Sequence, residues 1–210
     1  MKDGIVRDIF PTQIYEAQWE NFENVRSDLK SKLMPLFNDN VAAGNQYYDK
    51  DGQPIFKRTD PNLQNRKELQ PLTDFLNYHA RVYWKACGFT TRVEPYVMQV
   101  WANDVPPGGF TPAHNHNPVP IGGAFYVDAD SEMGNLYLED PLEMVKGKQP
   151  LDFTYKPYLW TETISVQPGK VVMFPGWMRH HVRSNMSKEN RIVVGFNIGA
   201  WLDFKPDPLG

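Results

Sequence analysis

The sequence predicts a mainly β protein, with helices in its N-terminal third and a sandwich, jelly roll or barrel in the remainder. Three observations lead to this fold class. Apolar residues before Gly88 recur at helical spacing. After Gly88, short strand-like runs alternate with turn sequences such as PPGG and QPGK. The 18 prolines and the 13% of aromatic residues also favour short strands and turns over a helical bundle.

The N-terminal third contains one expected strand and two expected helices. Residues 5–15 alternate loosely in polarity and indicate the strand. Apolar steps of three and four residues predict a first helix that ends at Pro35 and a second over about residues 61–87. Residues 38–60, rich in Asn, Asp, Gly and Pro, are expected to form a long loop. The apolar positions are Trp19, Phe22, Val25, Leu29 and Leu33 in the first helix and Leu72, Phe75, Leu76, His79, Val82 and Tyr83 in the second.

The rest of the chain is expected to form seven or eight short strands. Between two of them, residues 140–161 form a long connection that we expect to be either a functional lid or a disordered segment. The strands are expected at residues 91–103, 121–128, 135–139, 162–166, 170–175, 178–184 and 191–199.

Composition excludes several classes of function. The net charge is −3 and no Lys/Arg cluster is longer than a pair, so no nucleic-acid or membrane partner is expected. A single cysteine, Cys87, rules out an internal disulfide framework and fits a reducing compartment. The first residues lack the apolar core of a signal peptide, and no run approaches the roughly 18 apolar residues of a membrane span. We therefore expect a soluble, cytoplasmic protein.

Four of the five histidines lie at the ends of two strand-like runs and indicate a metal site. His114 and His116 are two residues apart, so on a strand both imidazoles would point into one cavity. A third ligand would come from His180 or His181. Imidazole suits Fe, Zn, Cu and Ni, so the histidines alone leave the metal open. His79 lies on the apolar face of the second helix and is interpreted as a histidine at the edge of the core.

The parity of the flanking residues favours His180 over His181 as the third ligand. Arg179 and Arg183 share the parity of His181, whereas Met178 and Val182 share that of His180. Charged groups are rarely left in a cavity without partners, so His181 is expected to face solvent and His180 the cavity. A bulge at this point would reverse the choice.

Several segments resemble the iron(II)/2-oxoglutarate-dependent oxygenase superfamily, in particular a branch related to prolyl 4-hydroxylases and found in phages and marine bacteria. The similar segments follow in order over nearly the whole chain: IFPTQIY, VWANDVPPGGFTPAHNHN, GGAFYV, GNLYLEDP, PGKVVMFPGWMRHHVRSN and RIVVGFNIGAW. The resemblance implies a double-stranded β-helix (a jelly roll) flanked by two long helices. It further implies one domain over residues 1–210, with helical support in 1–88 and the jelly-roll core in 89–205.

The resemblance assigns the metal site and the cosubstrate site. It implies that His114, His116 and His180 bind Fe(II) and that Arg191 pairs with the far carboxylate of 2-oxoglutarate, with O₂ as second cosubstrate. A guanidinium can engage a carboxylate through two parallel hydrogen bonds. We expect no catalytic residue beyond the metal ligands. The remaining expected contacts to the cosubstrate come from Tyr126, Tyr137 and Asn197.

The sequence departs from the superfamily pattern at two places. His116 stands where the superfamily usually has an Asp, so three neutral ligands would leave the metal its full 2+ charge. A carboxylate such as Asp128 or Glu139 is the alternative second ligand. The usual R-x-S is Arg191-x-Val193 here, which removes a hydroxyl that Tyr126 or Tyr137 would replace.

The resulting prediction is an Fe(II)- and 2-oxoglutarate-dependent dioxygenase that hydroxylates a small molecule or a protein, a peptidyl substrate being one alternative. Two other hypotheses compete with the oxygenase prediction. Gly108 followed by the His114-x-His116 pair, together with His181 and Asn185, is similar to a cupin metalloenzyme that uses no 2-oxoglutarate, although Pro120 and Ile121 stand where cupins have a Glu. The third reading is a metal-free jelly-roll binding module.

Overall fold

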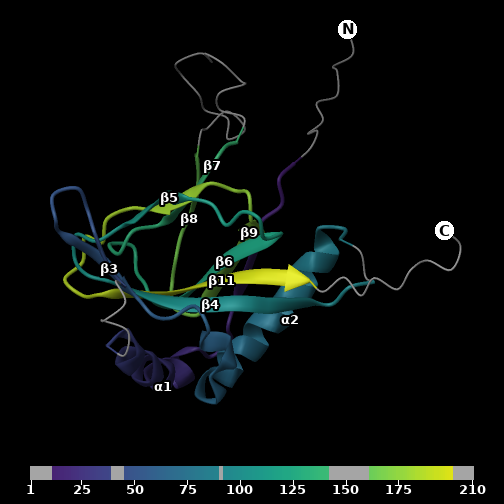
Figure 1. The fold of residues 1–210 in the computed structure, drawn as a ribbon, viewed down its shortest axis with the longest axis horizontal. Helices are drawn as coiled ribbons and strands as arrows, with labels where there is room; N and C mark the ends of the chain where they lie inside the picture. Colours follow the sequence, from purple (N-terminus) through teal and green to yellow (C-terminus); the bar gives the residue numbers. More distant parts are fainter. Residues whose placement is uncertain (1–10, 39–44, 90–91, 142–160, 201–210) are drawn as a thin grey trace, which may run out of the picture.

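The computed structural model describes residues 11–38, 45–89, 92–141 and 161–200. Two antiparallel β-sheets face each other, and two helices cover the outer face of the larger sheet (Figure 1). The expected mainly β fold with N-terminal helices is confirmed. The segment 142–160 of the expected lid and residues 5–10 of the first expected strand lie outside the described residues.

The larger sheet has seven strands and the smaller one four. Long antiparallel ladders hold the larger sheet together, above all those of β11 with β4 and β6. Its strand order is β1 (Tyr15–Gln18), β9 (Lys170–Pro175), β6 (Ile121–Asp128), β11 (Arg191–Ala200), β4 (Pro95–Val105), β3 (Pro54–Arg58) and β2 (Gln46–Tyr48). The smaller sheet has the order β5 (Thr111–His114), β10 (His180–Val182), β7 (Leu136–Glu139) and β8 (Thr161–Ile164).

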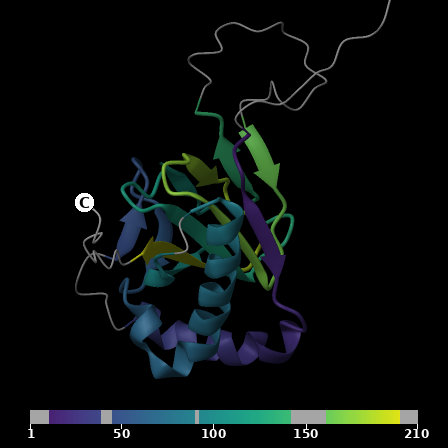
Figure 2. The ribbon, with the colours of Figure 1, turned by 90° about the vertical axis from the view of Figure 1, so that its right-hand side faces the viewer.

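Helices α1 (Glu23–Leu33) and α2 (Gln70–Ala86) lie across each other beneath the larger sheet (Figure 2). The second helix is shorter than expected, because 3-10 turns at Leu63–Asn65 and Lys67–Leu69 precede it. Pro71 occupies its first turn, where proline is tolerated because that N–H has no helical partner. Another 3-10 turn, Met34–Phe37, contains Pro35 and follows α1, as expected for a helix that proline ends.

Besides the first strand, which is Tyr15–Gln18 where residues 5–15 were expected, three details of the sequence prediction are wrong. Residues 46–58, expected as loop, form the β2–β3 hairpin, and β3 pairs with β4 of the larger sheet. Residues 111–114 form β5, which was not predicted as a strand. Val25 and Val82, expected on the buried helix faces, are exposed by 36% and 39%. Short strands stabilised by pairing to distant segments have little periodicity of their own, which explains the first two errors.

Alternation along β11 separates two apolar cores. One core fills the space between the helices and the larger sheet, and the other lies between the two sheets. Ile192, Val194, Phe196 and Ile198 point to the helices, whereas Val193 packs between the sheets. Because strand side chains alternate, Arg191, Gly195 and Asn197 share the face of Val193. The large sheet therefore presents polar and small residues to the space between the sheets.

No helix in the described ranges combines the length and the apolar character that crossing a bilayer requires.

Candidate metal centre and adjoining cavities

Three histidines from two segments meet between the sheets. The possible ligand atoms of His114, His116 and His180 all lie within 4.8 Å of one another. The ring centroids of His114 and His180 are 4.3 Å apart, and those of His116 and His180 are 5.0 Å apart. This spacing allows one metal ion to be bound by three imidazoles.

Strand pairing and one loop contact bring the three rings together. His114 ends β5 and is the direct cross-strand partner of His180, the first residue of β10. His116 lies just beyond β5, where its backbone N–H donates to the carbonyl of Gly176 at 2.7 Å. Its ring lies against Gly122 of β6, where a Cβ atom would collide with Nδ1 of His116. The expected i, i+2 pair thus shares one cavity, although only His114 is on the strand.

Hydrogen bonds define which ring nitrogen of each histidine is free. Nδ1 of His114 lies 2.9 Å from the carbonyl oxygen of Pro112, and Nδ1 of His180 lies 3.0 Å from that of Met178. Nδ1 of His116 lies 2.8 Å from Oδ1 of Asn197, whose amide nitrogen donates to Gln99 at 2.9 Å. These oxygens only accept, so each Nδ1 carries the proton and each Nε2 keeps its lone pair. All three Nε2 atoms are therefore available as ligands.

Burial keeps the three imidazoles neutral. Desolvation, with a smaller contribution from the neighbouring His114, lowers the pKa of His116 to about 4 and that of His180 to about 3. The pKa of His114 is also lowered, mainly by desolvation and further by the charges of Arg58 and Arg179. Neutral imidazoles at pH 7 are the form that binds a metal.

The carboxylates considered as alternative ligands are engaged elsewhere. A register shift between β6 and β11 makes Asp128 the partner of Ile192, on the helix side, where it forms ion pairs with Arg26 and Lys30 of α1 at 2.7 and 2.6 Å. Glu139 binds Arg179 and His181 at 2.7 and 2.9 Å. Within the described part of the chain, the cluster consists of the three histidines alone.

His181 and Tyr137 lie on the opposite face of the smaller sheet. His181 stacks on Tyr137 with ring centroids 5.1 Å apart, and Arg183 lies over the same tyrosine ring at 4.3 Å. The predicted orientations are confirmed, since His180 is 5% exposed and packs beside Phe174, whereas His181 faces Glu139. The structure does not bring Tyr137 to the histidine cluster.

Arg191 and Tyr126 form a buried polar pair without complete hydrogen bonding. Both side chains are fully buried, and Nε and Nη2 of Arg191 and the hydroxyl of Tyr126 have no hydrogen-bond partner among the described residues. Nη1 of Arg191 donates to the carbonyl of Met133. Burial lowers the pKa of Arg191 to about 10, so the side chain remains charged at neutral pH, and burial raises the pKa of Tyr126. Unpaired buried donors are rare, which singles out Arg191 and Tyr126 as groups able to bind a ligand that accepts hydrogen bonds.

Two cavities adjoin the histidines. An inner one of about 40 Å³ lies between the sheets and contacts the three histidines and Tyr126. An outer one of about 480 Å³ opens beside His114 and His116 and contains Asn197 in its wall. Arg58 and Trp101 line both cavities, as do His114 and His116. Sequence reasoning missed Arg58 and Trp101, because Arg58 lies in the segment interpreted as loop; the alternating run PIFKR was the available signal.

Residues 99–197 match a family model described as "Putative 2OG-Fe(II) oxygenase". This range includes the three histidines, Tyr126 and Arg191. No curated protein matches the chain at a significant level.

Solved structures share the fold at low identity. The non-heme α-ketoglutarate-dependent carbocyclase SnoK from nogalamycin biosynthesis is 12% identical, with a TM-score of 0.65 over 89% of this chain and 79% of that one. HygX from Streptomyces hygroscopicus, with nickel and 2-oxoglutarate bound, is 12% identical, with a TM-score of 0.57 over 90% and 83%. A Pseudomonas putida prolyl-4-hydroxylase is 12% identical, with a TM-score of 0.55 over 89% and 92%. In the region that carries the three histidines, the chain is therefore similar to the 2OG-Fe(II) oxygenase family, and its two-sheet fold is that of such enzymes.

Proposed function

We propose that the protein is an Fe(II)- and 2-oxoglutarate-dependent oxygenase that hydroxylates its substrate. One observation carries this proposal. Three neutral imidazoles with free Nε2 atoms line one cavity together with the unpaired phenol of Tyr126, and the incompletely bonded guanidinium of Arg191 lies on the neighbouring strand β11. The family model matched by residues 99–197 supports the same reaction class.

The three histidines fit a divalent metal that keeps open coordination positions. His114, His116 and His180 would supply three nitrogen ligands through Nε2. Asn197 holds the ring of His116, and backbone carbonyls hold the other two, so the rings are oriented before the metal binds. Iron together with 2-oxoglutarate, when bound, supplies the oxidation of a C–H bond by O₂ with decarboxylation of the cosubstrate.

Arg191 and Tyr126 fit the far carboxylate of 2-oxoglutarate. The free Nε and Nη2 atoms of Arg191 are the two donors that a carboxylate accepts side by side. The hydroxyl of Tyr126, on the neighbouring strand, is a third donor and takes the place of the hydroxyl that Val193 lacks. Apolar neighbours such as Val182 and Leu136 keep water from these groups.

The charge of the site also favours a divalent metal together with 2-oxoglutarate. Three neutral imidazoles leave a divalent metal its full charge, and no carboxylate of the described residues joins the cluster. A dianionic cosubstrate would neutralise that charge in a site of low dielectric.

The outward position of His181 supports this proposal over the cupin alternative, which requires His181 as a ligand.

Anaerobic reconstitution tests the proposal. We expect one equivalent of Fe(II) per chain, and a weak visible metal-to-ligand charge-transfer band when 2-oxoglutarate is added. His114→Ala and His116→Ala should each abolish stoichiometric iron binding, whereas His79→Ala should not. His79 is the matched control because its Nδ1 is bonded to the hydroxyl of Tyr15 at 2.7 Å, outside the cluster. Iron binding without the band in the wild-type protein would exclude the proposed use of 2-oxoglutarate.

A further inference from the structure

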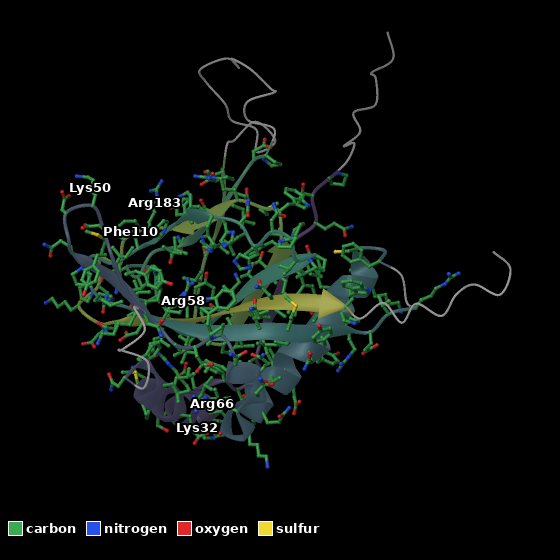
Figure 3. All side chains as sticks on the ribbon, in the orientation of Figure 1. Lys32, Lys50, Arg58, Arg66, Phe110 and Arg183 are labelled. Atoms are coloured by element: carbon green, nitrogen blue, oxygen red, sulfur yellow. The ribbon has the colours of Figure 1, made fainter. Side chains whose placement is uncertain are left out.

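Arg58 is a cation fixed at the entrance to the histidine cluster. It is the last residue of β3 and lies on the side of the larger sheet that faces the smaller sheet, whereas Lys32 and Arg66 lie among the helices (Figure 3). Its guanidinium is 5.1 Å from the ring centroid of Tyr47 and 5.5 Å from that of Trp101. Aromatic faces at this distance hold a guanidinium in one orientation.

Hydrogen bonds to the side chains of Asn103 and Tyr47 complete the fixation of Arg58. Nε donates to Oδ1 of Asn103 at 3.0 Å, and these two residues are cross-strand partners in the β3–β4 ladder. The side chain lines the outer cavity and also the inner cavity that holds the three histidines. Arg58 thus lies between the entrance and the candidate metal centre.

No acidic side chain neutralises Arg58 in the part of the chain that the structure describes. Asp60 is the acid in the wall of the outer cavity, and it lies 3.4 Å from Arg66 in an ion pair. A half-buried arginine without a counter-ion is uncommon, since buried charges are normally paired.

A second unpaired donor lines the same cavity. Nδ2 of Asn45 is buried and has no hydrogen-bond partner among the described residues. It precedes β2, the strand that carries Tyr47, and its backbone carbonyl accepts from the N–H of Arg58 at 2.9 Å. Arg58 and Asn45 are therefore neighbours, and both residues line the outer cavity.

We infer that the substrate carries an oxyanion group, a carboxylate or a phosphate, which binds Arg58 and Asn45 in the outer cavity next to the aromatic rings of Tyr47 and Trp101. The assignment of this ligand as substrate rests on the proposed oxygenase function; the anion site itself does not. Arg58 would hold the anionic end of the substrate, and the remainder would extend to His114 and His116. This site is separate from Arg191, which lies on β11 and lines neither cavity.

Matched fragments test the inference. The probes are benzoate, phenyl phosphate and the neutral benzamide, which share an aromatic ring that can pack on Tyr47 or Trp101. Calorimetric titrations are made with metal-free protein and with protein saturated anaerobically with Fe(II) and 2-oxoglutarate. We expect at least one of the two anions to bind tenfold or more tightly than benzamide in both states. Comparison of benzoate with phenyl phosphate identifies the preferred anion.

Variants assign the preference to Arg58. Arg58→Gln should abolish the preference for the anions over benzamide, and Arg58→Lys should keep part of this preference because the charge remains. Arg191→Ala should keep the whole preference. Arg81→Gln is the control for the loss of one positive charge, since Arg81 is an exposed residue of α2 that pairs with Glu94. Thermal unfolding of each variant shows whether it folds. If Arg58→Gln does not fold, Arg58→Lys and the wild-type comparison of benzoate with benzamide still test the inference.

Three outcomes would overturn the inference: equal affinity for charged and neutral probes, a preference unchanged in folded Arg58→Gln, or loss of the preference in Arg191→Ala or on saturation with 2-oxoglutarate. Failure of the proposed function is observed separately, as absence of the charge-transfer band. An Arg58-dependent preference in metal-free protein would then still establish the anion site.

Discussion

His180 and His181 are adjacent in the chain and have opposite surroundings. His180 packs against Phe174 and contacts the other two histidines of the cluster, whereas His181 bonds to Glu139 and stacks on Tyr137. The orientation follows from the alternation of a strand, because Met178 and Val182 are buried on the same parity as His180.

Substitution of the two histidines should therefore have opposite effects. We expect His180→Ala to lose stoichiometric iron and turnover of 2-oxoglutarate, and His181→Ala to keep both, since only the former removes an Nε2 from the cluster. Iron content after desalting measures the difference. Iron retained by His180→Ala and lost by His181→Ala would assign the site to His181 and favour the cupin alternative.

Arg191 should determine affinity for 2-oxoglutarate without determining affinity for the metal. Arg191→Ala is expected to raise the 2-oxoglutarate concentration required for half-saturation by one to three decades, because loss of one partner of a buried charge pair costs about 2–5 kcal/mol. Titration of the charge-transfer band measures this concentration. Arg183→Ala is the matched control, since Arg183 lies over Tyr137 on the outer face. A wild-type titration curve for Arg191→Ala would refute the assignment.

At the scale of elements, β6 helps to position His116, because Gly122 of this strand has no side chain where the ring of His116 lies. A Cβ on Gly122 would meet Nδ1 of His116, whereas a Cβ on Gly199 of β11 would meet the sulfur of Met98 at 3.2 Å and the hydroxyl of Tyr96 at 3.3 Å, and no histidine. Neither glycine has a positive φ, so the two differ in their surroundings and not in backbone strain.

Gly122→Ala should weaken metal binding with little loss of fold, because the added methyl group displaces the ring of His116 from Asn197. Gly199→Ala should bind metal like the wild-type protein. Iron titrations of both variants, with circular dichroism as the check on folding, measure the effect. Equal affinities in the two variants would show that the contact between Gly122 and His116 does not position the ligand.

The hairpin β2–β3 shows how element prediction fails when pairing is distant. Its residues include Asp, Gly and Pro, which locally favour a turn, and Asp49 and Gly52 do form the turn between the strands. The flanking residues become strands because β3 pairs with β4, more than 40 residues later in the chain. This pairing brings Arg58 to the cavity, so the functional proposal for Arg58 required the tertiary structure.

At the scale of the whole molecule, the burial of three imidazoles makes the stability of the metal-free protein depend on pH. Unfolded histidines titrate near a pKa of about 6.5. In the folded protein, burial lowers the pKa of His116 to about 4 and that of His180 to about 3. Between these pH values the unfolded state binds more protons, so the free energy of unfolding must fall as the pH falls.

We therefore expect metal-free protein to lose stability between pH 6.5 and about pH 4, by at most about 1.4 kcal/mol per pH unit for each histidine. Denaturant unfolding in the presence of a chelator measures this loss. The double variant His116→Gln/His180→Gln should show a smaller loss, since carboxylates common to both proteins contribute equally. The same pH dependence in the two proteins would contradict the lowered pKa values.

The amino-acid sequence by itself determined the properties that depend on local periodicity. These are the mainly β fold with N-terminal helices, the strands β6 and β9 with their correct ends, and the inward orientation of His180. Alternation and helical spacing extend over only a few residues, so a short stretch of sequence is enough to predict these properties. The placement of Arg191 on the face between the sheets also follows from this alternation, whereas its role toward 2-oxoglutarate stays a prediction.

Only the tertiary structure decided which residues from distant segments meet. It placed Tyr137 on the outer face, joined Asn197 to His116, and paired Asp128 with α1. It also placed Arg58 and Trp101 beside the three histidines. Such contacts depend on strand order and on register shifts, as between β6 and β11, where one skipped residue turns Asp128 to the helices. A pairing between strands is a long-range property, and no short stretch of the sequence contains it.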